Sequence, residues 1–335
     1  MSQVSVNDVW SAIRFRPPEK VGKETGTAPS WAGYGDHKTA LPPASAQSGR
    51  PYSLMLLHEK GSCAMTVFLF WNINRKPLQA VVASLARRHA PDVILLTECG
   101  SAPNVTLTAL NQPGCSEYSY APGIGCRKVD VFTRFPARFI RPVLEEERLT
   151  VRHLSLPGLT DILLAVAHFP AKTHWKEASQ ALEATHLSRS VTRAELQVGH
   201  SRTVLVADLN MNPFEPGVAG ASGLHGVMTR RIAEKRERTV QGRRFAFFYN
   251  PMWSLHGDQS PGPPGTYYYS RSEQVEFFWN MFDQVLIRPD LLEFFSNDDL
   301  RILDCDGTRS LLTQEGVPDA RHASDHLPLL FTLRL

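Results

Sequence analysis

Runs of apolar residues that stop at a polar side chain are the feature that most limits how this chain can fold. The stretch VLVADLN is apolar up to Asp208 and places Asn210 two positions further on. The run FLFWNIN ends in the same way at Asn72, VILLTE at Glu98 and LLAVAH at His168. Short apolar runs of this kind are typical of buried strands. In layered α/β folds the ends of such strands converge on one edge and build the site there.

Helical patterns alternate with these runs, so we expect a single mixed α/β domain built from packed layers. Apolar residues at helical spacing predict helices over 78–89 and 175–196. Strands are expected within residues 66–73, 92–97, 129–135, 137–144, 149–156, 161–168, 203–210, 265–271, 281–288 and 327–335. The pattern loosens between 211 and 264, where Gly, Pro and a basic run occur.

The first part of the chain differs in composition from the rest. Residues 16–51 are dense in Pro, Gly, Ser, Ala and Lys and have little apolar periodicity. This composition predicts a poorly ordered extension over 1–64, followed by one domain over 65–335. Alternatively, Met65, which directly precedes the first strong strand, is the natural start.

Bulk composition excludes several classes of protein. The hydrophobic fraction of 42% and charged fraction of 21% are ordinary for a soluble globular chain, and the formal net charge is only +3. No stretch approaches the roughly 18 apolar residues of a membrane span, and no secretory signal is recognisable. The 5 cysteines form no CxxC pair. Their odd number favours reduced thiols in a cytoplasm over a disulfide framework or a structural zinc site.

The residue types at the strand ends suit one chemistry. Side chains two apart on a strand share a face, so Asp208 and Asn210 are expected to project into one cleft. A fixed carboxylate beside an amide can orient a water and hold a phosphate oxygen. Glu98 offers the hard oxygen ligand that Mg²⁺ prefers. Alone, a polar residue at a strand end most often only caps a loop, but the joint pattern favours a site.

Two histidines and a further aspartate complete the pattern. His168 ends a strand, and His326 lies just before the last one. Imidazole N–H groups can donate hydrogen bonds to the charge that builds on phosphoryl oxygens. Asp283, near the start of a strand, is suited to fix the tautomer of a histidine and raise its basicity.

In their order along the chain, these motifs resemble those of the endonuclease/exonuclease/phosphatase superfamily, the fold of pancreatic-type deoxyribonuclease and exonuclease III. The resemblance spans residues 66–335. The matching motifs are WN at Asn72, TE at Glu98, AHFPAK at His168, ADLNMNP at Asp208, FDQVL at Asp283 and SDH at His326. Ala207 is a mild departure, because Gly usually precedes the Asp-x-Asn motif.

The resemblance implies a four-layer α/β/β/α sandwich of two packed mixed sheets, with a divalent-metal phosphoesterase site on one edge. It implies that Glu98 binds Mg²⁺ or Mn²⁺, with Asn72 and Asp325 close to the ion. Asp208 orients or deprotonates the attacking water, and Asn210 helps to place the phosphate.

The resemblance also assigns the histidines. His326 contacts the scissile phosphate and is oriented by Asp283. Apurinic-site nucleases of the superfamily carry Tyr where this chain has His168. The chain is therefore more similar to the deoxyribonuclease, deadenylase and lipid-phosphodiesterase branches, in which this histidine stabilises the pentacovalent state or protonates the leaving oxygen.

The segment 228–253 is the most basic in the chain and is followed by aromatic residues. Its candidate phosphate contacts are Arg230, Arg231, Arg243 and Arg244. One interpretation is a nucleic-acid grip beside the site, since cations neutralise phosphates and aromatic rings stack on bases. The other is a solvated helix followed by a core strand, because FAFF looks buried. Arg75 and Lys172 follow motif residues and either hold phosphates at the cleft mouth or form a solvated rim.

These observations favour a metal-dependent nuclease with a DNA or RNA substrate, most simply an endonuclease. The same catalytic set serves phosphatases and phosphodiesterases of inositol phosphates or phospholipid head groups, so that class stays open. A membrane-docking apolar loop would favour it, and the sequence shows no clear one. A catalytically inactive interaction protein is disfavoured, because every catalytic position is filled. The sequence does not separate DNA from RNA or endo- from exonucleolytic cleavage.

Overall fold

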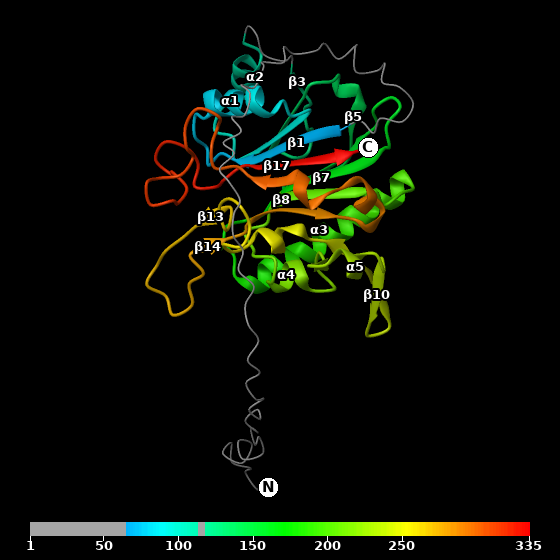
Figure 1. Ribbon diagram of the computed structural model, residues 1–335. Coiled ribbons are helices and arrows are strands. Elements are labelled where there is room, and N and C mark those ends of the chain that lie inside the picture. The colour runs from blue at the N-terminus through cyan, green and yellow to red at the C-terminus, as the bar shows by residue number, and fades with distance from the viewer. Residues whose placement is uncertain (1–64, 113–117) are drawn as a thin grey trace, which may run out of the picture. The chain divides into compact units, whose positions relative to one another are not determined.

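Two mixed sheets packed face to face form the centre of the protein. The computed structural model describes residues 65–112 and 118–335, and the extension predicted for 1–64 lies outside them. Within this part of the chain, helices cover the outer face of each sheet (Figure 1). The expected four-layer α/β/β/α sandwich is therefore confirmed.

The first sheet has the strand order β16–β17–β1–β2–β4–β3. Its strands are β1 (Met65–Asn72), β2 (Val93–Thr97), β3 (Ser119–Tyr120), β4 (Val129–Thr133), β16 (Leu300–Ile302) and β17 (Leu329–Arg334). Strand β1 is parallel to β2 and antiparallel to β17, so the last strand lies beside the first. Successive side chains of β1 point to opposite faces. Phe68 and Phe70 thus enter the space between the sheets, and Leu69 and Trp71 pack under the helices.

The second sheet has the strand order β5–β6–β7–β8–β15–β12–β9. Its strands are β5 (Ile140–Glu146), β6 (Leu149–Leu154), β7 (Ile162–His168), β8 (Thr203–Asp208), β9 (Gly226–Val227), β12 (Phe248–Tyr249) and β15 (Asp283–Ile287). Strand β8 is parallel to β7 and antiparallel to β15. Val204 and Val206 of β8 face the first sheet, while Leu205 and Ala207 face the helices. The fully buried central strands explain the near-continuous apolar runs of the sequence.

Helices α1 (Gln79–His89) and α2 (Pro103–Leu110) cover the first sheet, and α3 (Glu177–Val198) and α4 (Pro216–Ala219) cover the second (Figure 1). The helix expected over 78–89 is confirmed as α1. The helix expected over 175–196 is displaced slightly towards the C-terminus, where Gly199 ends it in the left-handed region at φ 84°. Short helical segments are α5 (Arg230–Ala233), η3 (Ala137–Phe139), η4 (Pro251–Leu255), η5 (Pro289–Phe294) and η6 (Asn297–Asp299).

Several elements depart from the sequence expectations. The basic segment forms a hairpin of β10 (Glu237–Val240) and β11 (Arg243–Ala246). The strand expected over 265–271 shrinks to β13 (Tyr267–Tyr268), which pairs with β14 (Trp279–Asn280). Helix α2 and strand β16 have no counterpart among the predicted elements. Each is short and relies on tertiary pairing, so its local signal is weak.

Candidate active site

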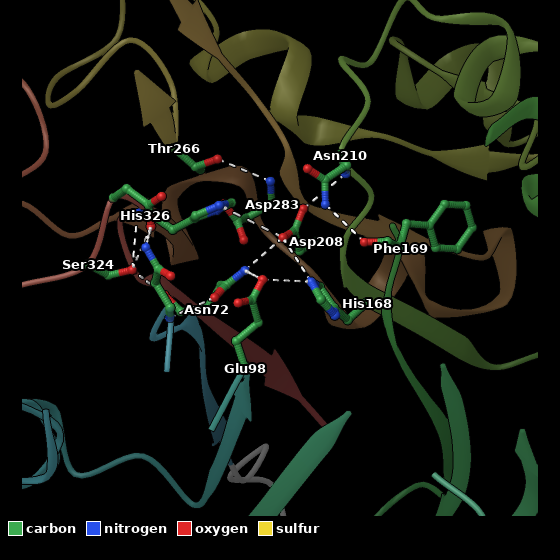
Figure 2. Close-up of polar contacts among 12 residues, drawn as sticks. Asn72, Glu98, His168, Phe169, Asp208, Asn210, Thr266, Asp283, Ser324 and His326 are labelled. Carbon is green, nitrogen blue, oxygen red and sulfur yellow. Dashed lines mark hydrogen bonds and ion pairs between the residues drawn. The ribbon is translucent and has the colours of Figure 1, made fainter. Parts of the chain in front are cut away.

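Polar side chains from both sheets meet at one edge of the sandwich (Figure 2). In the second sheet, the strand register places His168 opposite Asp208, and Asp208 opposite Asp283. In the first sheet, Asn72 is the last residue of β1 and Glu98 directly follows β2. The structure thus brings together groups that are widely separated in the sequence.

The carboxylate of Asp208 lies at the centre of this edge and is fully buried. The amide Nδ2 of Asn72 donates to Asp208 Oδ2 at 2.9 Å and to Glu98 Oε1 at 3.3 Å. His168 Nε2 lies 3.1 Å from Glu98 Oε1 and 3.7 Å from Asp208 Oδ2. The hydrogen bond from His168 is the main reason that the pKa of Glu98 falls to about 2, although burial opposes it. Glu98 is therefore ionised at neutral pH.

His326 and Asp283 form a buried pair on the other side of Asp208. The Nδ1 atom of His326 lies 2.7 Å from Asp283 Oδ2, and its Nε2 atom lies 3.9 Å from Asp208 Oδ2. Burial alone would lower the pKa of His326, but the carboxylates of Asp283 and Asp208 outweigh it and raise that pKa to about 10. His326 is therefore an imidazolium whose Nε2–H points into the site. The hydroxyl of Thr266 accepts a hydrogen bond from the main-chain N–H of Asp283 at 3.1 Å.

Asn210 lies beside Asp208, but the prediction that both side chains project from one face of a strand is wrong. Strand β8 ends at Asp208, so Asn210 is not on the strand. It adopts a left-handed φ of 50°, which Asn tolerates better than most residues. Its main-chain N–H donates to Asp208 Oδ1 at 2.9 Å, and its Nδ2 donates to the carbonyl of Phe169 at 3.0 Å. A turn, rather than strand periodicity, positions this amide.

Residues with strained backbone conformations cluster at the same edge. Left-handed φ values occur at Asn74 (47°), Arg75 (56°), Glu98 (50°) and Asn210 (50°), although such values are uncommon outside glycine. The main-chain N–H of Arg75 donates to the carbonyl of Glu98 at 2.7 Å, which ties together the loops after β1 and β2. Gly100 permits this approach, because a Cβ there would lie 2.3 Å from the Arg75 carbonyl oxygen.

Asp325 and several supporting residues hold the last motif in place. Asn74 Nδ2 donates to Asp325 Oδ1 at 2.8 Å. Ser324 Oγ donates to the carbonyl of the last β1 residue at 2.7 Å, and Trp71 Nε1 donates to the carbonyl of His326 at 2.8 Å. The sequence motifs contained Trp71 and Ser324, but gave no sign that they join β1 to the segment around His326. No local pattern identified Asn74 or Thr266.

Two of the predicted substrate cations lie at the rim of the site. The guanidinium of Arg75 is 76% exposed, with its Nε 3.8 Å from Glu98 Oε2. Lys172 forms an ion pair with Glu215 and lies 5.4 Å from the centroid of the Phe282 ring. Both side chains lie at the surface, as each of the two expectations for them requires, phosphate contact or solvated rim.

The basic segment does not lie beside the site, contrary to one sequence expectation. It leads into β12, which pairs with Ile287, the end of β15 opposite Asp283. Figure 1 accordingly shows β10 far from β13 and β14. Arg230 is occupied within the fold, donating to the carbonyls of Leu292 and Phe295. The remaining predicted contacts are exposed, and they are Arg231 on α5 and Arg243 and Arg244 on β11.

The aromatic residues of the basic segment bear out only in part the interpretation of FAFF as a buried core strand. Phe247 and Phe248 are buried, whereas Phe245 is only half-buried. The buried strand β12 is therefore short, and the solvated part of the segment is a hairpin rather than a long helix.

The donor atoms at this edge fit a divalent cation. Carboxylates of Glu98, Asp208 and Asp283 surround the imidazolium of His326, which leaves local negative charge. Ligand atoms of Asp208, Asp283 and His326 lie within 4.8 Å of one another. A protonated imidazole has no lone pair for a metal. Asp208, Asp283 and His326 by themselves are therefore a poor ligand set. The carboxylate of Glu98 is 25% exposed and has Asn72 beside it, which suits a hard cation that keeps several waters.

Comparison with known proteins identifies the family. The model of the Endonuclease/Exonuclease/phosphatase family matches residues 69–326. The chain belongs to this family. Membership indicates a phosphoesterase, and enzymes of the family are typically dependent on divalent metals. No curated protein matches the sequence.

Three solved structures illustrate the similarity of the fold. The endonuclease domain of TRAS1, a telomere-specific non-LTR retrotransposon, is 13% identical, with a TM-score of 0.48 and coverage of 81% of this chain and 99% of that one. The human Nocturnin catalytic domain is 15% identical, with a TM-score of 0.47 and coverage of 80% and 93%. An AP endonuclease from Archaeoglobus fulgidus is 13% identical, with a TM-score of 0.47 and coverage of 81% and 100%.

Two further properties concern membrane-spanning helices and the state of the cysteines. Over residues 65–112 and 118–335, the helices include none with the length and apolar character needed to span a membrane. The cysteines in this part of the chain, Cys99, Cys126 and Cys305, are free thiols.

Proposed function

We propose that the protein is a Mg²⁺- or Mn²⁺-dependent nuclease that hydrolyses phosphodiester bonds in DNA or RNA. The observation that carries the proposal is the environment of Asp208 Oδ2. Asn72 donates to this buried oxygen at 2.9 Å, and the Nε2 atoms of His168 and His326 lie 3.7 and 3.9 Å from it. A fixed base between two imidazoles suits in-line attack of water on a phosphoryl group.

Asp208 takes the role of orienting the water and accepting its proton. Its hydrogen bonds from Asn72 and from the main chain of Asn210 fix both carboxylate oxygens. Glu98, with Asn72 and Asp325 nearby, would hold the divalent cation. A bound cation supplies Lewis-acid polarisation of the phosphoryl oxygen. The amide of Asn210 helps to place the phosphate.

His326 contacts the scissile phosphate in this proposal. Because Asp283 holds Nδ1, the Nε2–H remains available to donate to a phosphoryl oxygen that gains charge. His168, whose Nε2 lies 3.7 Å from Asp208 Oδ2, stabilises the pentacovalent state or protonates the leaving oxygen.

Cations at the rim support a polyanionic substrate. Arg75 and Lys172 flank the site and can contact phosphates next to the scissile one. Arg231, Arg243 and Arg244 lie too far along the sheet to touch that group. They are proposed to bind outlying phosphates of a long strand, whereas Arg230 supports the fold. Alanine at Arg243 and Arg244 should weaken binding of long but not short oligonucleotides and reduce the salt dependence of binding.

A cleavage panel tests the proposed function. Purified protein is incubated with plasmid DNA, single-stranded DNA and single-stranded RNA, with Mg²⁺, Mn²⁺ or EDTA. Metal-dependent cleavage by the natural protein is expected, and His326→Ala should abolish it while leaving the circular dichroism spectrum intact. Absence of cleavage of every nucleic acid with either metal would contradict the proposal.

One observation favours a second candidate, a phosphodiesterase of phospholipid head groups or inositol phosphates. Val275, Phe277 and Phe278 form an apolar loop next to β14 and are 72%, 53% and 48% exposed. The loop contacts Phe214, whose ring centroid lies 5.2 Å from that of Phe277. Such a loop could rest on a lipid surface as well as on bases. Phosphate release from inositol phosphates without cleavage of nucleic acid would favour this candidate.

We also propose a cytoplasmic location. The free thiols at Cys99, Cys126 and Cys305 support a reducing compartment. Fractionation of cells that express the tagged protein tests this directly.

A further inference from the structure

A cavity of about 260 Å³ lies beside the active site, on the β4 side of the first sheet. Glu98 and His168 line it together with Arg127 and Lys128. Neither His326 nor Asp283 lines it. The cavity therefore shares Glu98 and His168 with the proposed active site but does not reach His326 or Asp283.

The sheet register explains why these cations lie there. Val129, the first residue of β4, pairs with Thr97, the last residue of β2. Lys128 therefore lies next to the position that Glu98 occupies after β2. Strand β4 is on the opposite side of β2 from β1 and β17, so the cavity extends away from His326.

Cations dominate the lining of this cavity. Arg75, Arg127 and Lys128 outnumber the carboxylates of Glu98 and Asp130. Arg127 and Lys128 form no ion pair with any residue of the described ranges, so their charges are not neutralised within the fold. Glu98 is the residue suited to hold the divalent cation, which would make the cavity more positive still.

The loop that carries these cations is held firmly. The main-chain N–H groups of Ile124 and Gly125 donate to Glu145 Oε2 at 2.6 and 2.7 Å. The guanidinium of Arg152 is 1% exposed and lies 3.4 Å from the other oxygen of Glu145. A carboxylate fixed in this way orders the turn before Arg127, so the cations need little reorganisation to bind an anion.

We propose that this cavity binds a second phosphate group of the substrate, next to the scissile one, through Arg127 and Lys128. The inference rests on the proposed phosphoesterase function and adds a determinant of substrate choice. The neighbouring phosphate of a nucleic-acid strand and the second phosphate of an inositol phosphate share this chemistry. The experiment below distinguishes these sources.

The test compares substrates that differ only by a second phosphate. Thymidine 5′-(p-nitrophenyl phosphate) is assayed with and without a 3′-phosphate, and thymidine 3′-(p-nitrophenyl phosphate) with and without a 5′-phosphate. Inositol 1-phosphate and inositol 1,4-bisphosphate form a separate arm. For the natural protein, the second phosphate should raise kcat/KM about tenfold in at least one pair, the size expected for a charge-assisted contact. The pair that shows the gain identifies the source.

Variants assign the gain to the cavity. In Arg127→Ala/Lys128→Ala the ratio of kcat/KM within the responding pair should fall to about one, as the charged contact is lost. Arg141→Ala, which removes an exposed cation from β5, should keep the ratio of the natural protein. A gain that persists in the double variant overturns the proposal. So does a lack of gain in every pair when the one-phosphate substrates are hydrolysed.

Binding without turnover separates this proposal from the proposed function. Calorimetry in EDTA measures the affinity of thymidine 3′,5′-bisphosphate against that of each monophosphate and of inositol 1,4-bisphosphate against inositol 1-phosphate. A preference for a bisphosphate that Arg127→Ala/Lys128→Ala removes supports the cavity even if no substrate is hydrolysed. Equal affinities within every set overturn it. Lack of hydrolysis by the natural protein with any metal would count against the proposed function alone.

Discussion

At the scale of single residues, the chemistry of the site depends on which neighbours each titratable group has. His326 is deeply buried, yet carboxylates around it hold its proton. Glu98 is half-buried, yet hydrogen bonds from His168 and Asn72 hold it ionised. Both groups are set in the charge state that a phosphoesterase site requires, one as a donor and the other as an anion.

Asp208→Asn tests the base at this scale. The amide oxygen can still accept the hydrogen bond from Asn72, but the amide NH2 then faces the main-chain N–H of Asn210, and the amide cannot take a proton from water. We expect kcat to fall by about 10²- to 10⁴-fold, the usual range for general-base catalysis, with an unchanged circular dichroism spectrum. The exposed Asp298→Asn is the matched control and should keep full activity. An Asp208→Asn protein with nearly natural kcat would remove Asp208 from the mechanism.

Asp283→Asn tests the charge state of His326 through pH. The folded pKa of His326, about 10, exceeds its ordinary value of 6.5. The stabilising effect of the pair is therefore fully present below about pH 6.5 and is lost as pH rises through 10. Without the Asp283 carboxylate, the imidazolium should deprotonate at lower pH. The alkaline limb of the kcat/KM profile should move to lower pH, and Asp298→Asn should not move it.

At the scale of elements, the second sheet is tied to its covering helix by a buried ion pair. Arg288, after β15, places its Nε 2.8 Å from Glu195 Oε1 of α3, and the side chains are 3% and 10% exposed. Arg288 also donates to the carbonyl of Phe247 at 3.1 Å and lies 3.9 Å from the centroid of the Phe248 ring. This contact holds β12, β15 and α3 together at the end of the sheet away from the site.

Arg288→Met should destabilise the protein by about 3–5 kcal/mol, because it leaves the Glu195 carboxylate buried without its partner. Urea unfolding followed by circular dichroism measures the change. Arg193→Met is the matched control, because Arg193 lies on α3, the helix that carries Glu195. It breaks an exposed pair with Glu146, for which about 1 kcal/mol or less is expected. Adding Glu195→Leu to Arg288→Met should recover much of the loss, and no recovery would contradict the proposed cause.

At the scale of the whole described domain, the site is a junction between the two sheets. Glu98 and Asn72 come from the first sheet, whereas His168, Asp208 and Asp283 come from the second. The apolar space between the sheets, where the rings of Phe68 and Phe331 stack at 4.8 Å, sets the distance between these groups. Packing of the core therefore controls the geometry of the site.

A ligand that binds this junction should stabilise the whole domain. We expect Mg²⁺ or Mn²⁺ to raise the melting temperature, by an amount equivalent to about 2.7 kcal/mol at a concentration of 100 times Kd. EDTA should reverse the shift. Glu98→Gln should remove most of it, whereas the exposed Glu293→Gln should not. Differential scanning calorimetry measures these shifts, and an unchanged melting temperature with both metals would argue against a metal at Glu98.

The sequence by itself determined the long buried strands and the identity of the groups at their ends. A strand such as β8 is buried on both faces, so its apolar run and its terminal Asp208 are visible without any partner. The order of the motifs was enough to identify the family, because that order follows the strand order of the chain. Local signals of this kind depend only on near neighbours in the sequence.

Only the tertiary structure decided which of these groups meet and which cationic residues lie next to them. Asn210 is placed by a turn, and the guanidinium of Arg230 donates hydrogen bonds to main-chain carbonyls of a distant segment. The basic hairpin extends from the far end of the second sheet, while Arg127 and Lys128, which belong to none of the sequence motifs, line the cavity at Glu98. These outcomes depend on strand register and on contacts between segments far apart in the chain, for which a local pattern of residues holds no information.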